Sequence, residues 1–386
     1  MSTLIEGSWD AARGIAKKSF TALPSHNIAV SAGINRVLAS DVHALCDLPT
    51  YATSAMDGYA VAGSGPWKII GEVKAGMPMK RALKAGDAVG IATGAVIPDG
   101  TFGIIRWEKA QVDEKVLTGQ AIENQDIRPA AHECKAGDLL IKAGTKLNPA
   151  MIGLLAAAGL DTIDVVRKPR VALLLLGDEI QLTGVPSRGL VRDALGPQLP
   201  GWLEKMGCET ISSIYISDEL DLVVNAARQA CASADIVITT GGTAAGPRDY
   251  LHNALAEIGA DILVDTVAVR PGHPMLLART QTSAIFGLPG NPQSAIVALI
   301  SLGQPVIDAM LGENRDDLPT VITRDELTAP ADFTRLIIGN LVDGQFVVEE
   351  YLGSAMLRGL AHSTGFAVVV KTLTAPGESV RWLSLP

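Results

Sequence analysis

Between residues 170 and 290, strand-like segments alternate with helical segments, and this alternation constrains the fold more than any other feature. The strand-like segments read VALLLL, ETISSIY, DIVITT and SAIFGLPG, and each is followed by a helix-like segment. Strands that are apolar at nearly every position are typical of a parallel sheet with helices on both faces. The sequence therefore predicts an α/β domain over residues 167–312, with a sheet in which parallel strands dominate.

The segments on either side have other patterns. Short apolar runs between turns indicate a small β domain over 47–130. We expect the flanking residues, 1–46 and 131–166, to form one discontinuous helical domain into which that β domain is inserted. It includes a short strand near 27–31, a helix over 34–39, and a helix that Asn148 caps and Pro149 begins. The alternating pattern of 313–386 predicts a small C-terminal β-barrel or sandwich, and of these we expect the barrel. The predicted fold class is multidomain α/β plus β.

Charge and cysteine content exclude several classes of protein. The formal net charge is −9, and only 4% of residues are aromatic, so a nucleic-acid or anionic-membrane footprint is not expected. The four cysteines contain no CxxC pair. No apolar stretch reaches the ~20 residues of a membrane-spanning helix, and the N-terminus lacks the apolar core of a signal peptide. We expect a soluble cytoplasmic protein.

Two glycine-containing turns follow predicted strands, where α/β sheets bind ligands. Gly241, Gly242 and Gly246 precede Asp249 and a helix, which suits phosphate binding. The same loop also fits a tight turn with Asp249 as a helix cap. In the second turn, Pro289 and Gly290 precede Asn291, Pro292 and Ser294, a pattern that favours either helix capping or contact with a phosphate or pterin edge.

Charged residues mark two further turns. The acids of Gly177-Asp178-Glu179 end a buried strand, where carboxylates need a partner, water or a metal. Arg270 and His273 bracket a Pro-Gly turn, an arrangement that suits either a bound oxyanion or plain surface charge. No HExxH zinc motif or GxSxG nucleophile elbow is present.

Two motifs carry a family resemblance: SAMDGYAV at residues 54–61 and LPGNP at 288–292. With the turns above, and in the same order along essentially the whole chain, they make this sequence similar to the MoeA/gephyrin E-domain family of molybdopterin molybdenumtransferases. The resemblance implies a MoaB/MogA-like α/β domain. It also implies a Mg²⁺-dependent insertion of molybdate into adenylylated molybdopterin, with release of AMP.

The resemblance further implies partners and residue roles. It implies a homodimer, with each cleft between the α/β domain of one subunit and the SAMDGYAV domain of the other, and contact with a MogA-like adenylyltransferase. The implied catalytic acids are Asp57, Glu179, Asp218 and Asp249, and the last three are the implied Mg²⁺ ligands. The implied pterin, phosphate or oxyanion contacts are Gly241, Gly242, Gly246, Arg270, His273, Pro289, Gly290, Asn291 and Ser294.

The chain departs from the family pattern at several polar positions. A serine of the GGVSVG loop is Ala244, the second lysine of KPGKP is His273, and a TG pair reads Leu176-Gly177. An aspartate of an RxxGED-like segment is Glu133. These losses favour an alternative reading, a catalytically impaired or altered paralogue that binds molybdopterin or acts as a scaffold. A generic nucleotide-binding protein is disfavoured because GxGxxG and Walker spacings are absent.

Overall fold

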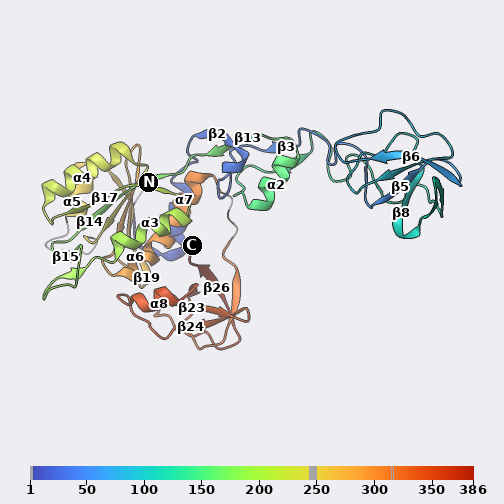
Figure 1. The fold of residues 1–386 in the computed structure, drawn as a ribbon. Helices are drawn as coiled ribbons and strands as arrows, with labels where there is room; N and C mark the ends of the chain where they lie inside the picture. The colour runs from blue at the N-terminus through green and yellow to red at the C-terminus, as the bar shows by residue number, and fades with distance from the viewer. Residues whose placement is uncertain (1–2, 243–249, 314, 316) are drawn as a thin grey trace.

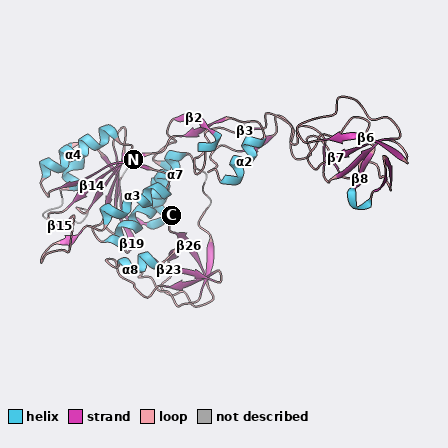
Figure 2. Cartoon of the chain, in the orientation of Figure 1, coloured by secondary structure: helices cyan, strands magenta, loops and turns pink. Residues whose placement is uncertain are grey.

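The computed structural model describes residues 3–242, 250–313, 315 and 317–386. Figure 1 shows an elongated molecule, with an α/β unit and a small barrel at one end and a separate β unit at the other. Figure 2 shows that most helices gather around the α/β sheet, whereas the barrel and the separate β unit are mainly strands.

The α/β unit is built on a sheet in the order β17-β14-β18-β21-β20-β19. The first four of these strands are parallel neighbours, as predicted, whereas β20 runs antiparallel to both β21 and β19. Their bounds are β14 (Arg170–Leu176), β17 (Glu209–Ile216), β18 (Ile236–Thr240), β19 (Asp261–Arg270), β20 (Leu276–Arg279) and β21 (Ala284–Leu288).

Helices cover both faces of this sheet. As a result, successive residues of a strand point into two different cores, one on each face. Val171 and Leu173 belong to one core, while Ala172 and Leu174 belong to the other. Residues of α3, α6 and α7 fill the first core, and residues of α4 and α5 fill the second. The bounds are α3 (Leu195–Lys205), α4 (Leu220–Ser233), α5 (Leu251–Glu257), α6 (Pro292–Ala298) and α7 (Gln304–Leu311).

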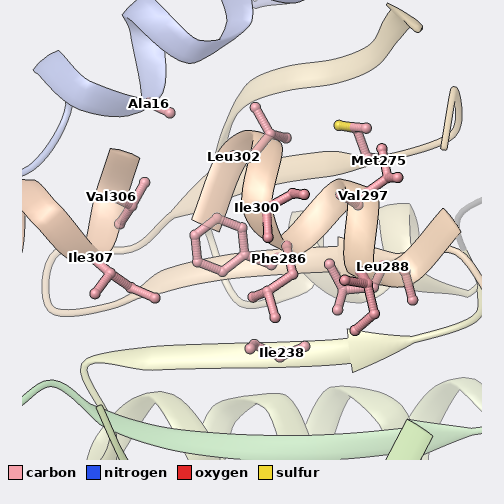
Figure 3. Packing of buried hydrophobic residues seen from close by; sticks show 14 of the residues in the cluster. Ala16, Ile238, Met275, Phe286, Leu288, Val297, Ile300, Leu302, Val306 and Ile307 are labelled. Atoms are coloured by element: carbon pink, nitrogen blue, oxygen red, sulfur yellow. The ribbon is translucent and has the colours of Figure 1, made fainter. Parts of the chain in front are cut away.

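A π-helical segment, Leu299–Gly303, joins α6 and α7 into one continuous helix. Figure 3 shows its Ile300 and Leu302 packed in the same core as Phe286 and Ile238 of the strands. The expectation that no apolar stretch reaches the length of a membrane-spanning helix is wrong: within the described part of the chain, this 20-residue helix alone is long and apolar enough to cross a membrane. However, 94% of its apolar window is buried inside the protein. That burial is typical of a core helix.

The N-terminal segment packs on the α/β unit. β1 (Leu4–Ser8) pairs in parallel with β19, and α1 (Trp9–Lys18) lies against α7. Trp9 is fully buried, and its indole N–H donates to Ser301 Oγ at 2.8 Å. We expected these residues in the discontinuous helical unit; they lie on the α/β core because α1 buries its apolar face there.

The middle of the molecule joins two separate stretches of chain. β2 (Ser25–Ala29) pairs with β13 (Thr162–Val166), and β3 (Val42–His43) pairs with β12 (Leu139–Ile141). A 3₁₀ turn covers Val30–Ala32.

One helix of this middle unit is confirmed and another is not. α2 (Pro149–Ala157) begins as predicted, with the Asn148 side chain accepting from the Met151 N–H. The helix expected over 34–39 is wrong. Val37 and Leu38 instead pair in isolated bridges with Lys146 and Val165, so extended pairing replaces helical turns there.

The separate β unit is a six-stranded sheet in the order β8-β5-β7-β6-β10-β9. A short pair, β4 (Thr53–Ser54) with β11 (Ile127–Arg128), stands beside it, and a 3₁₀ turn covers Trp107–Lys109. The strands are β5 (Gly58–Val61), β6 (Trp67–Val73), β7 (Asp87–Ile91), β8 (Gly103–Arg106), β9 (Gln111–Asp113) and β10 (Val116–Thr118).

The C-terminal strands close on themselves, which confirms the predicted barrel. β23 pairs with β24 and β25, β26 pairs with β25 and β22, and β22 pairs with β24, so the ring is complete. β19 also pairs with β23, which joins the barrel to the α/β sheet. The elements are β22 (Thr320–Thr323), β23 (Thr334–Val342), β24 (Gln345–Val348), α8 (Leu357–His362), β25 (Gly365–Val369) and β26 (Ser379–Ser384).

Candidate functional site

The loops predicted to bind ligands all leave the same edge of the α/β sheet. β14, β17, β18 and β21 are parallel, so their carboxyl ends coincide. Gly177 follows β14, Asp218 lies beyond β17, Gly241 follows β18 and Pro289 follows β21. The sheet topology therefore brings these segments together.

Two acids meet where β14 and β17 end. The Asp178 N–H donates to Asp218 Oδ2 at 3.4 Å, and the Asp218 N–H donates to Asp178 Oδ1 at 3.3 Å. The Tyr215 hydroxyl donates to the Gly177 carbonyl at 2.5 Å. Burial raises the pKa of Tyr215, and the charges of Asp178, Asp218 and Glu179 raise it further. The charges of three carboxylates therefore all disfavour ionisation of the Tyr215 hydroxyl.

Glu179 lines a cavity of about 620 Å³. Its carboxylate lies beside Gly177, whose φ of +135° is a conformation that residues with a side chain rarely adopt, so glycine is favoured there. The cavity is also lined by Asp193, Gly241, Gly290 and Asn291. Two short paired strands, β15 (Ile180–Gln181) and β16 (Val191–Arg192), form one wall. We call this space the β14 cavity.

A second cavity, of about 460 Å³, lies between the turn after β19 and the barrel. Among the described residues that line it, the ionisable ones are Arg270, His273 and Arg335. Arg270 and Arg335 are direct neighbours in the parallel pairing of β19 with β23. Like charges placed side by side on a sheet repel each other, so this pair is best satisfied by an anion. We call this space the cationic cavity.

Neither guanidinium of this pair is neutralised by a carboxylate in the described part of the chain. Arg270 lies 5.1 Å over the ring of Phe333, and Arg335 Nη1 donates to the Thr328 carbonyl and hydroxyl. His273 Nε2 lies 3.3 Å from a carboxylate oxygen of Glu6. Ser294 and Gln293, both almost fully buried, complete the floor.

The two cavities share a wall. Gly290, Asn291 and Pro292 face the β14 cavity, while the next residues, Gln293 and Ser294, face the cationic cavity. A barrel loop reinforces this wall, because Ser354 accepts the Gln293 N–H at its carbonyl and lies 3.5 Å from Asn291 Nδ2. Two ligands, one bound in each cavity, would therefore lie next to each other across this wall.

The structure brings together many of the predicted site residues. Glu179, Asp218, Gly241, Gly242, Pro289, Gly290 and Asn291 lie at one sheet edge, and Arg270, His273 and Ser294 lie in the adjoining cavity. Asp57 does not join them: it precedes β5 in the separate β unit, far from β14 in Figure 1. Its Oδ1 accepts the Thr93 N–H and hydroxyl. Gly246 and Asp249, with Ala244, lie outside the described residues.

Sequence reasoning missed several residues of this site. Arg335 lies in the barrel strand β23, and only its register with Arg270 places it here. Glu6 comes from β1, and no motif marks it. Asp178 was visible beside Glu179 but was not assigned a ligand role, although it contacts Asp218. No group of three or more possible metal ligands occurs among the residues that the structure describes.

The fold and site define a class: an α/β ligand-binding protein with an acid-edged cavity beside a cationic one. Comparisons with known proteins make the class specific. Residues 8–159 match the MoeA N-terminal region (domain I and II), and residues 172–309 match a probable molybdopterin binding domain.

The full-length relatives agree. A molybdopterin molybdenumtransferase from Nostoc is 32% identical over 378 residues, which cover 91% of this chain and 86% of that protein. One from Staphylococcus aureus is 30% identical over 333 residues, covering 82% and 79%. A molybdopterin biosynthesis MoeA protein from Pyrococcus horikosii has a TM-score of 0.81 at 25% identity, covering 98% of this chain and 99% of that one. This chain belongs to the molybdopterin molybdenumtransferase family, and its role lies in molybdenum cofactor biosynthesis, as a transferase.

Proposed function

We propose that this protein transfers molybdenum from molybdate to adenylylated molybdopterin, with release of AMP. One observation carries the proposal. Among the described residues, the ionisable ones that line the first cavity are two arginines and a histidine, and this cavity shares a wall with one lined by glycine turns, two carboxylates and one arginine. The reaction joins an oxyanion to a phosphate-bearing pterin. Two adjoining cavities of opposite character supply a place for each.

In this proposal the cationic cavity takes molybdate. Arg270 and Arg335 stand side by side without carboxylate partners in the described chain, so a dianion relieves their mutual repulsion. His273 and Ser294 add donors from the turn after β19 and from the start of α6. The buried floor limits competition from water for the same donors.

The β14 cavity takes the pterin and its phosphates. Gly241 and Gly242 have φ of +80° and +65°, so the backbone there can turn its N–H groups toward a ligand at close approach. Gly290, Asn291 and Pro292 line this cavity on the side that adjoins the cationic cavity, and Pro289 precedes them in the same turn. Gly246 is proposed to act with them on the resemblance alone.

The acids are proposed to hold Mg²⁺ and to act as the catalytic acids. The fit rests on Asp178 and Asp218, which meet where β14 and β17 end, since a bound cation would balance the charge of the two carboxylates. Asp218 and Glu179, with Asp178 beside them, are the described candidates, and Asp249 is added from the family pattern. When bound, Mg²⁺ would neutralise phosphate charge and polarise the linkage to AMP.

The protein is further proposed to act as a homodimer. Asp57 directly precedes β5, and Figure 1 shows β5 in the separate β unit, at the other end of the molecule from β14. A second copy would therefore have to supply Asp57 to the sheet edge. Thr93 fixes one of its oxygens and leaves the other for a ligand. Because the substrate is an adenylate, contact with a MogA-like adenylyltransferase is also proposed.

The test is direct. Purified protein is mixed with adenylylated molybdopterin, sodium molybdate and MgCl₂, and AMP is quantified by chromatography. AMP release that requires molybdate and stops with EDTA supports the proposal. No release, where the Staphylococcus relative works in parallel, would refute it. Molybdopterin binding without release would instead support the impaired paralogue.

A further inference from the structure

One tryptophan of this chain lies on the surface. Trp107 is 55% exposed, whereas the other four are buried or partly buried: Trp9, Trp67, Trp202 and Trp382. Three of those four donate the indole N–H to another residue of the chain. The indole of Trp107 has no hydrogen-bond partner among the described residues. An indole left in water forgoes the free energy that burial of its ring would provide, so a ligand that covers it would gain that free energy.

Strand pairing places Trp107 beside Asp57. Gly58 and Arg106 are direct partners in the antiparallel pair of β5 with β8, so residues 57 and 107 stand opposite each other one position further on. The Trp107 N–H donates to the Asp57 carbonyl at 3.4 Å. Side chains of directly opposed residues lie on the same face of an antiparallel pair. The indole and the carboxylate are therefore neighbours on one face of the separate β unit.

Two further contacts fix this pair. A Cβ atom at Gly58 would overlap the carbonyl oxygen of Ile105 in β8, so glycine lets the two strands approach closely at this point. Thr93 donates its N–H and its hydroxyl to Oδ1 of Asp57, at 2.7 and 3.0 Å. Oδ2 has no donor among the described residues. The face therefore presents a free carboxylate oxygen beside an exposed aromatic ring, and backbone contacts hold both.

A planar nitrogen heterocycle fits this arrangement. Its face can stack on the indole, as any aromatic base does, while an amino or ring N–H group at its edge can donate to the free oxygen of Asp57. The proposed substrate contains two such rings, adenine and pterin. We propose that Trp107 binds the substrate by stacking on one of these rings, when the Asp57 face of one subunit meets the sheet edge of the other. The inference rests on the proposed transfer reaction and the proposed homodimer.

The test measures AMP release by the full-length protein as the concentration of adenylylated molybdopterin is varied. A stack on a ring that does not react acts equally on bound substrate and transition state, so its loss should raise KM and leave kcat unchanged. Trp107→Leu is expected to raise KM roughly five- to a hundredfold, the size of a base–aromatic stack. Trp107→Phe keeps an aromatic face and should bring KM back to within about fivefold of wild type.

A matched control and an inhibitor sharpen the result. Val116→Ala removes an apolar side chain that is 47% exposed on β10 of the same β unit, and should leave KM unchanged. Inhibition by AMP identifies the stacked ring. If the indole stacks on adenine, Trp107→Leu should weaken that inhibition by the factor by which it raises KM. If the indole stacks on pterin, inhibition by AMP should not change.

Mixed dimers show whether the indole acts in the site that its own Asp57 serves. A dimer of one Asp57→Asn chain and one Asp218→Asn chain has one intact site in the proposed assembly. That site joins the Asp57 face of the Asp218→Asn chain to the sheet edge of the other chain. Trp107→Leu added to the Asp218→Asn chain should raise KM, whereas the same change added to the Asp57→Asn chain should have no effect.

Other outcomes overturn the inference. If wild type releases no AMP, the proposed reaction is wrong and the inference falls with it. If wild type is active and Trp107→Leu keeps its KM, the stack alone is wrong. A lower kcat at unchanged KM, or equal effects of Trp107→Leu and Trp107→Phe, would indicate a structural role. If Trp107→Leu weakens the dimer in sedimentation velocity, or acts equally from either chain of the mixed dimer, the indole does not stack on substrate.

Discussion

Replacing Arg335 by methionine should separate oxyanion binding from folding. Methionine keeps the apolar stem of the side chain and removes the guanidinium. Loss of a charge-assisted hydrogen bond to a bound anion costs about 1.5–3 kcal/mol, so tungstate affinity is expected to fall roughly ten- to a hundredfold.

The same substitution should change stability little. It removes two hydrogen bonds from Nη1 to Thr328, each worth about 0.5–1.5 kcal/mol at most. It also removes the repulsion from Arg270 across the β19–β23 pair, worth about 0.2–1 kcal/mol. Both hydrogen bonds are exposed, so each lies near the low end of its range. With the opposing loss of repulsion, the free energy of unfolding should change by no more than about 1 kcal/mol.

Titration calorimetry with tungstate and urea unfolding by circular dichroism measure the two quantities on the same protein. Arg324→Met is the matched control, because Arg324 belongs to the same barrel and pairs with Asp343 at an exposed site. It should leave tungstate affinity unchanged. The reasoning is refuted if Arg335→Met keeps wild-type affinity, or if affinity falls only in step with a large loss of stability.

Three other predictions concern the fold and the assembly. Burial raises the pKa of Asp308 to about 6, so its protonated form contributes stability that is complete below about pH 4 and is lost as pH rises through 6. In urea unfolding, Asp308→Asn should therefore gain on wild type by ~1.4 kcal/mol between pH 5 and pH 8, and a constant difference would contradict this. Asn148→Ala removes the cap of α2 and should cost ~1 kcal/mol, whereas Asn148→Asp should cost less. Asp57→Asn and Asp218→Asn should each lack AMP release. If each site uses both subunits, an equal mixture of the two variants should recover about a quarter of wild-type activity after subunit exchange. No recovery in proven mixed dimers would contradict a shared site.

Local sequence signals predicted the parts of the fold that local chemistry determines. The cap at Asn148 and the proline after it located α2, and the apolar strands predicted the sheet with two covered faces. The segment at 34–39 failed because Val37 and Leu38 pair with residues more than a hundred positions away. β1 was missed for the same reason, because its partner β19 lies more than 250 positions further along the chain.

The residues of the candidate site also fall into those that local sequence signals predict and those that depend on distant pairing. Turns that follow parallel strands could be found, because the topology of such a sheet brings their ends together. Arg335 and Glu6 could not, since each depends on the register of a strand from another part of the chain. Asp178 could have been assigned by its position next to Glu179, but only the structure shows which of the two acids contacts Asp218.

Strand β19 takes part in two sheets, and this has a consequence for how the protein unfolds. Residues 261–268 pair with β20 or β1, and the last two residues pair with β23 of the barrel. The barrel and the α/β unit therefore share one continuous ladder of hydrogen bonds, whereas the separate β unit has its own. In native-state hydrogen exchange, amides of β23 and β19 should open together as one foldon, with the walls of the cationic cavity, while amides of β5 and β7 open independently.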